Sequence, residues 1–270
     1  MKTFLNYMTI MALLLTFSSC EEEEVMTFDS ERGVNFVIYS SAYGTYTDDY
    51  ENLKSEHNFV KDYGSVQEVT MTLPDYLVEV GVQLEGEFSD KPVKVKVKTE
   101  AVEGYDLAQV ELPEEVVIEP GEYRTHFTVV CKQPAEYNKE YKVKLVFDYA
   151  NSNVIAGTKE RQEYEITVSD ELIWEDMYVS DFASWNAMCS QYLGEGGDVK
   201  LRFIYVGLKQ GGYNYNTVKS GWYYYAYIGK PTYAFREKYE LTYLRNALAE
   251  YNASHDNPLA ELDGTLVTFP

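Results

Sequence analysis

Apolar and polar residues alternate in short runs between residues 33 and 168, and this pattern predicts β-strands. The clearest run is residues 92–98, in which Val93, Val95 and Val97 occupy one phase and lysines the other. A period of two places the valines on a buried face of a sheet and the lysines on a solvated face. The other predicted strands are residues 34–39, 66–73, 77–84, 116–118, 123–131, 141–147 and 164–168.

Turn residues separate these runs. In residues 119–122, Glu-Pro-Gly-Glu, proline stands at the second position and glycine at the third, where a positive φ is needed. Short antiparallel strands joined by such turns predict an immunoglobulin-like antiparallel β-sandwich over residues 30–171. The Cys-Trp-Cys core signature of true immunoglobulin domains is absent from the sequence, so the expected kinship is one of architecture.

The pattern changes near residue 172. Leu241, Leu244, Leu248 and Tyr251 have the spacing of one apolar face of a helix. Alternating or apolar runs elsewhere in this region predict strands. The chain is therefore expected to be mainly β, with the sandwich followed by a smaller, aromatic-rich α+β domain over residues 172–270. The strands expected in that domain are residues 199–206, 222–228 and 266–270.

The first residues have the pattern of an export signal. Lys2 precedes an apolar run over residues 7–17, which is shorter than the roughly 20 residues that span a bilayer. Ser18 and Ser19 then lead into Cys20, and this arrangement resembles the bacterial lipoprotein signal, although Phe17 stands where leucine is usual. We therefore predict a signal peptide at residues 1–19 and lipidation of Cys20. An ordinary secretory signal with a chance cysteine is the alternative.

The composition restricts the partners of the mature chain. Four glutamates follow Cys20, and residues 20–29 are interpreted as an acidic anchor spacer. The whole chain has 23 Lys and Arg against 44 Asp and Glu, a net charge of −21. Nucleic acid is a poor partner for such a chain, because phosphate binding needs clusters of Lys and Arg. Membrane attachment is expected to come from the lipid on Cys20.

Catalytic and metal-binding patterns are weak. His57, His126 and His255 have neither metal-ligand nor triad spacing, and His126 falls on the polar phase of its strand. Cys131 and Cys189 fall on apolar phases and are expected to be buried and unreactive. We therefore expect no catalytic residues, no metal and no cofactor. A hydrolase with a pair of carboxylates remains the alternative, because acidic pairs are numerous.

Aromatic residues are the strongest candidates for ligand binding. The chain has 26 Tyr, and many of them lie between residues 205 and 243 among glycines and asparagines. Tyrosine rings stack on the C–H faces of sugars, and hydroxyl and amide groups satisfy sugar hydroxyls. The predicted ligand-binding residues are Tyr213, Asn214, Tyr215 and Trp222. Packing of these rings into a core is the alternative, above all for Trp222.

Several short motifs lie along the chain after Cys20 and its acidic tag. They are Gly33-Val-Asn-Phe, Val80-Gly-Val-Gln-Leu-Glu-Gly, Gly104-Tyr-Asp, Ile118-Glu-Pro-Gly, Tyr251-Asn-Ala-Ser-His and Val267-Thr-Phe-Pro. Together these features resemble an uncharacterised family of Bacteroidota lipoproteins, domain-of-unknown-function family 4843. This resemblance implies a lipoprotein on the outer face of the outer membrane, encoded beside a SusC/SusD-like pair of TonB-dependent transporter and lipoprotein lid. It implies a non-enzymatic accessory component that binds glycan or peptide or docks on that pair.

The anchor prediction is tested by Cys20→Ala. Because the thiol is the acylated group, the variant should lose lipid labelling and should leave the membrane fraction. Replacement of the four following glutamates by alanine is the matched control, which should keep the lipid but reduce cleavage by external protease. A Cys20→Ala protein that still partitions into outer membranes with the mass of the mature wild type would contradict the prediction.

Overall fold

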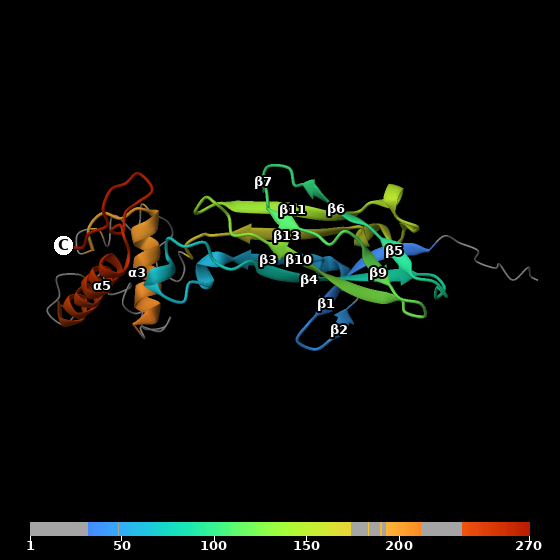
Figure 1. The fold of residues 1–270 in the computed structure, drawn as a ribbon, viewed down its shortest axis with the longest axis horizontal. Coiled ribbons are helices and arrows are strands. Elements are labelled where there is room, and N and C mark those ends of the chain that lie inside the picture. The colour runs from blue at the N-terminus through green and yellow to red at the C-terminus, as the bar shows by residue number, and fades with distance from the viewer. Residues whose placement is uncertain (1–31, 48, 174–182, 184–189, 191–192, 212–233) are drawn as a thin grey trace, which may run out of the picture.

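The computed structural model describes residues 32–47, 49–173, 183, 190, 193–211 and 234–270. Within these residues the protein is mainly β, with strands arranged in stacked antiparallel sheets and two α-helices. Figure 1 shows the strands running along the long axis and helices α3 and α5 gathered at one end. The blue start of β1 lies towards the other end (Figure 1).

Two sheets form the sandwich. In the first, which we call sheet A, the strand order is β12-β1-β4-β10-β8, and β2 also pairs with β1. Its strands are β1 (Gly33–Ser40), β2 (Thr45–Thr47), β4 (Tyr76–Glu85), β8 (Val110–Glu111), β10 (Arg124–Cys131) and β12 (Ile155–Ala156). In the second, sheet B, the order is β3-β13-β11-β6, and β7 also pairs with β11. Its strands are β3 (Lys54–Asn58), β6 (Val97–Ala101), β7 (Asp106–Leu107), β11 (Glu140–Phe147) and β13 (Glu163–Ser169).

Aromatic side chains join the two sheets at the core. Phe36 of β1 stacks on Phe147 of β11 with ring centroids 4.1 Å apart, and it meets Tyr164 of β13 edge to face at 6.1 Å. Each of these residues is at most 3% exposed. Since stacked and edge-to-face pairs add to the free energy of burial, these rings fix the sheets against each other.

The alternation predicted from the sequence is confirmed in the long strands. In β4 the even-numbered residues from Val78 to Leu84 are buried, and in β10 the buried residues are Phe127, Val129 and Cys131. Burial raises the pKa of the Cys131 thiol to about 12, which keeps it protonated and unreactive. The turn at residues 119–122 is also confirmed, with φ of +81° at Gly121.

The run at residues 92–98 is not one strand. β5 (Val93–Val95) pairs with β9 (Val116–Ile118) in a small separate sheet, whereas β6 begins at Val97 and pairs with β11. The chain changes sheets at Lys96, whose backbone N–H donates to the Ser152 hydroxyl at 2.9 Å. The valine and lysine phases were predicted correctly. The break between β5 and β6 could not be predicted, because the alternation of valine and lysine continues through it.

Residues 66–73 form a turn structure and not the predicted strand. A 3₁₀-helix, η3 (Val66–Glu68), is capped by Ser65 and Glu68 in a capping box. The remaining 3₁₀-helices are η1 (Tyr50–Asn52), η2 (Phe59–Lys61), η4 (Tyr149–Asn151) and η5 (Lys159–Arg161). Because the spacing of Ser65 and Glu68 is itself a helix-start signal, the sequence contained the information needed to avoid this error.

The described residues after 172 are mostly helical. The expected helix is confirmed as α5 (Ala234–Ser254), but the predicted strand at residues 199–206 is wrong, because this segment lies in α3 (Asp198–Gln210). The predicted final strand at residues 266–270 is likewise reduced to an isolated bridge between Ala260 and Leu266. The predicted strand at residues 222–228 lies outside the described residues, and the domain boundary near residue 172 stays a prediction.

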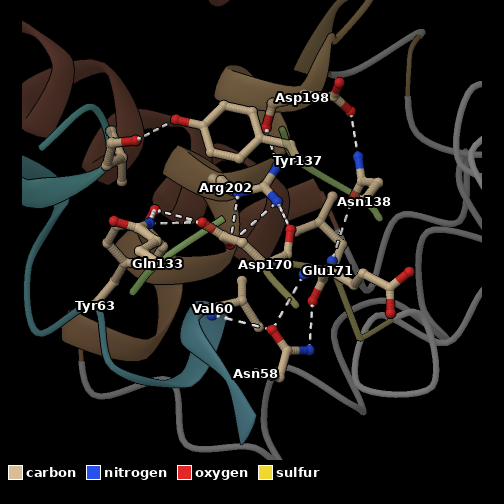
Figure 2. Close-up of polar contacts among 12 residues, drawn as sticks. Asn58, Val60, Tyr63, Gln133, Tyr137, Asn138, Asp170, Glu171, Asp198 and Arg202 are labelled. Atoms are coloured by element: carbon tan, nitrogen blue, oxygen red, sulfur yellow. Dashed lines mark hydrogen bonds and ion pairs between the residues drawn. The ribbon is translucent and has the colours of Figure 1, made fainter. Parts of the chain in front are cut away.

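Helix α3 joins the sandwich through a buried ion pair, shown in Figure 2. The side chains of Arg202 and Asp170 are both 0% exposed, and the Arg202 Nη2 and Asp170 Oδ1 atoms are 3.2 Å apart. The Asp170 carboxylate also accepts from the Tyr63 hydroxyl at 2.9 Å and from Gln133 Nε2 at 2.8 Å. The guanidinium carbon of Arg202 lies 3.7 Å from the centre of the Tyr137 ring.

This arrangement predicts a large loss of stability in Arg202→Met. The variant leaves the Asp170 carboxylate buried without its cation, which should lower the free energy of unfolding by about 3–5 kcal/mol. Urea unfolding measures this difference. Lys132→Met is the matched control, because Lys132 pairs with Asp75 at 2.6 Å but is partly exposed to water, so its loss should change stability little. Equal losses in the two variants would contradict this account of the junction.

Candidate functional site

The residues predicted as sites lie outside the described part of the chain. These are the lipidation site Cys20 and the ligand-binding candidates Tyr213, Asn214, Tyr215 and Trp222. Cys189 also lies outside it. These assignments stay predictions, and the candidate site below is built from other residues.

An aromatic patch lies on the outer face of sheet A. It consists of Tyr39, Tyr46, Arg124 and His126, and each of these side chains touches another member. Tyr39 and His126 stack with ring centroids 3.9 Å apart, and Tyr39 and Tyr46 are 4.9 Å apart. The Arg124 guanidinium lies 5.7 Å from the Tyr46 ring centre. His126 is exposed, as its place on the polar phase predicted, and the other three residues are half-buried.

Strand pairing brings these residues together. Tyr39 and Tyr46 are direct cross-strand partners between β1 and β2. His126 of β10 is the partner of Gly81 in β4, and Gly81 is in turn the partner of Val37 in β1. Since side chains two residues apart share a face, Tyr39 and Val37 project on the side that also carries His126. The patch therefore combines strands that are far apart in the sequence.

Gly81 makes room for the patch at its centre. A Cβ atom at Gly81 would lie 2.8 Å from Val37 Cγ2 and 3.2 Å from Tyr46 Cδ1, distances that leave no space for a side chain. The Tyr46 ring occupies the space above this glycine. A glycine inside a strand often marks such a close approach, and this signal in the sequence could have pointed to the patch.

Polar groups surround the rings. The Tyr46 hydroxyl lies 3.2 Å from His126 Nδ1, and His126 Nε2 lies 4.0 Å from Glu79 Oε2. Arg124 Nε donates to Gln83 Oε1 at 2.8 Å. Burial, and next the neighbouring Tyr39, raise the pKa of Tyr46, so its hydroxyl keeps its proton at neutral pH. The patch thus offers ring faces together with donors and acceptors that are already oriented.

More exposed aromatic side chains continue the patch. The Arg124 guanidinium also lies 4.9 Å from the Tyr123 ring centre, and Tyr123 meets Phe88 edge to face at 5.6 Å. Tyr123 is 41% exposed and Phe88 is 61% exposed. These two rings add exposed aromatic surface beside the patch, which a ligand or a partner could contact.

A second feature is an open cleft at the N-terminus of α3. The cleft has a volume of about 730 Å³ and lies between residues 194–200 and residues 261–270. The Glu261 carboxylate accepts from the backbone N–H groups of Gly197, Val199 and Lys200 at 2.9–3.0 Å. A carboxylate at this position satisfies free helix N–H groups and interacts favourably with the helix dipole. The N-terminus of α3, where an anion would bind, is therefore already occupied by the Glu261 carboxylate.

Lys200 is buried beside this cleft. The residue is 3% exposed, and its ammonium group donates to the Glu195 carbonyl at 2.8 Å. Burial lowers the pKa of Lys200 to about 8, although Glu261 and Glu195 act in the opposite direction. Desolvation of the charged form outweighs the nearby carboxylates.

The other histidines have structural contacts. His57 Nε2 lies 2.7 Å from Asp62 Oδ2 and its ring stacks on Tyr76, and His255 stacks on Tyr251. Within the described ranges, no group of His, Cys, Asp and Glu side chains could hold a metal ion. No helix among the described residues has the length and apolar character needed to cross a membrane.

Comparisons with known proteins give weak likenesses. No family model and no curated protein matches the chain. The apo-form Calx CBD1 domain is 12% identical, with 52% of this chain and 98% of that domain covered and a TM-score of 0.32. A protein of unknown function from Bacteroides ovatus is 10% identical, with 50% and 43% covered and a TM-score of 0.30.

Another likeness is to Bacteroides thetaiotamicron EndoBT-3987 with Man5GlcNAc product, which is 10% identical with a TM-score of 0.31, 44% of this chain and 28% of that chain being covered. The chain thus spans less than half the length of either Bacteroides structure. At these scores the likenesses carry no argument about function.

The lowered pKa of Lys200 predicts how stability depends on pH. An unfolded lysine has a pKa of about 10.4, so between pH 8 and 10 the unfolded chain binds more protons at Lys200 than the folded chain. Lys200 should therefore make the free energy of unfolding rise by about 1–2 kcal/mol from pH 8 to pH 9.5.

Urea unfolding of the wild type and of Lys200→Met at the two pH values isolates this effect, because the difference between them removes the other titrating groups. A stability difference that does not change with pH would contradict the assignment.

Proposed function

We propose that this protein is a non-enzymatic accessory lipoprotein on the outer face of the outer membrane, where it binds glycan or peptide for a nutrient-uptake system. In this proposal the chain docks on a SusC/SusD-like pair of TonB-dependent transporter and lipoprotein lid. The lipid on Cys20 holds it to the membrane, and the acidic residues after Cys20 direct it to the outer face. The alternatives are a surface hydrolase and a purely structural envelope protein.

The sequence of the first residues supports the location. Lys2, the short apolar run and Cys20 resemble a lipoprotein signal, and the glutamates that follow resemble an outer-surface tag. The motifs that resemble the Bacteroidota lipoprotein family support the association with a transporter pair. A net charge of −21 agrees with an attachment that comes from lipid and not from anionic membrane surfaces.

The aromatic patch is the observation that carries the binding function. Its rings stand on a sheet, and β4 at its centre pairs with β1 on one edge and with β10 on the other. Binding groups on a rigid support lose little conformational freedom when a ligand arrives, and tyrosines have few rotors to freeze. Such a surface suits ligand capture, and it requires no reactive group.

We also infer that the sandwich is immunoglobulin-like. The chain crosses between the two sheets, from β4 in sheet A by way of β5 to β6 in sheet B, and from β10 in sheet A directly to β11 in sheet B. Crossings of this kind are a property of Greek-key sandwiches. Sandwiches of this type present ligand surfaces on many unrelated proteins, so the fold agrees with a binding function but does not select one.

Incubation of the full chain with separate panels of glycans and peptides tests the proposal. Because the proposed protein has no catalytic residues, it should retain members of one panel on an affinity matrix and leave their chain lengths unchanged by mass spectrometry. Boiled protein is the control. Shortened products would identify a hydrolase, and retention of neither panel would leave a structural protein.

A further inference from the structure

We propose that the aromatic patch on the outer face of sheet A is a binding site for an extended, uncharged glycan of pyranose units. This inference rests on the proposed function, and it selects one ligand class and one site. The site consists of Tyr39, Tyr46, Arg124 and His126, with Glu79 and Gln83 as polar neighbours and with Tyr123 as its extension.

The position of the patch favours side-chain recognition. Extended peptides that bind to sheets do so by adding a strand to a free sheet edge, where backbone N–H and C=O groups are available. The patch instead spans the face of β4, whose two edges are paired with β1 and β10, and its rings come from the strands on either side, β1 and β2 on one and residues 124–126 of β10 on the other. A ligand on this face meets rings and polar side chains, and it meets no row of free backbone groups on β4.

The chemistry of these side chains matches a sugar ring. A pyranose has an apolar C–H face and a rim of hydroxyls, so it needs a ring to stack on and polar groups within reach of that ring. The Tyr46 hydroxyl, the His126 ring nitrogens and the Glu79 carboxylate lie in sequence along the patch, with contacts of 3.2 Å and 4.0 Å. These groups hold one another in place before a ligand arrives.

Charge argues against a polyanionic glycan. The patch contains the Glu79 carboxylate, and Glu122 lies close enough to raise the pKa of Tyr46 as a minor cause. The Arg124 guanidinium is held over two tyrosine rings and donates to Gln83. With a net charge of −21 on the whole chain, repeated uronate or sulfate groups would be repelled.

The length of the patch favours several sugar units. Contacts run without interruption from His126 through Tyr39, Tyr46 and Arg124 to Tyr123, with successive separations of 3.9, 4.9, 5.7 and 4.9 Å. Phe88 adds one more exposed ring beyond Tyr123. A row of this length can contact more than one sugar of an extended chain, so affinity should grow with the number of sugars.

Calorimetry with the full chain in detergent tests the site. The probes are uncharged gluco-, xylo- and manno-hexaoses, hexagalacturonate as the charged comparison, and a tryptic digest of casein as the peptide comparison. We expect at least one uncharged hexaose to bind more tightly than its trisaccharide, and hexagalacturonate and the peptides to bind more weakly.

Two variants locate the binding. Tyr39→Ala and His126→Gln each remove one stacking ring, and each should weaken hexaose binding about tenfold. His126→Gln keeps a hydrogen-bonding side chain at an exposed position, so it should leave the melting temperature unchanged. Tyr105→Ala is the control, because Tyr105 is an exposed tyrosine, 42% accessible, that lies outside the patch and whose ring contacts Lys142 of sheet B. Its binding should change less than twofold.

The outcomes separate this inference from the proposed function. Hexaose binding that is unchanged in both patch variants would overturn the site while the proposed function stands. Tighter binding of hexagalacturonate, or of peptides alone, would overturn the ligand class while the proposed function again stands. Shortened hexaose would overturn the non-enzymatic function, and binding of none of the probes would overturn both.

Discussion

The buried pair between Asp170 and Arg202 is the interaction on which the arrangement of the helical end depends. Two charges removed from water are stable only when their remaining hydrogen-bonding groups are satisfied as well. Tyr63 and Gln133 supply donors to Asp170, and each comes from a different segment of the chain. The end of β13, the segment before η3 and helix α3 are therefore held by one carboxylate.

Further packing holds helices α3 and α5 against the end of the sandwich. Gly207 of α3 lets Val66 of η3 and Leu244 of α5 approach to within 3.2 Å and 3.1 Å of where its Cβ would lie. The Thr70 and Tyr251 hydroxyls, 2.7 Å apart, add a further link between this segment and α5. Buried side chains of the sandwich and of both helices belong to one hydrophobic cluster. The helical end thus shares the core of the sandwich.

The sequence predicted those elements whose stability is local. Alternation identified β4 and β10 because each has one buried and one solvated face. It failed for α3, because Val199, Leu201 and Phe203 alternate while the residues between them, Lys200 and Arg202, are also buried. The partners that make this burial possible are Glu195, Glu261 and Asp170, and no local pattern reveals them. The edge strand β3 was missed for a similar reason. Its residues are polar and show no apolar alternation, and its strand conformation depends on pairing with β13.

The candidate site shows the same limit in another form. The exposed phase of His126 could be predicted from its strand, but its meeting with Tyr39 and Tyr46 depends on the register of four strands. At the helical end the polar groups are buried and already paired within the chain. The Asp170 carboxylate, for example, is bound by Tyr63, Gln133 and Arg202. The polar groups of the patch keep capacity, because a tyrosine hydroxyl has one donor and two acceptor sites, and a carboxylate accepts several bonds. The Tyr46 hydroxyl has one partner, His126, and the Glu79 carboxylate has two, Thr128 and His126. Both groups can therefore form further hydrogen bonds, so the outer face of sheet A can orient its side chains and still bind a ligand.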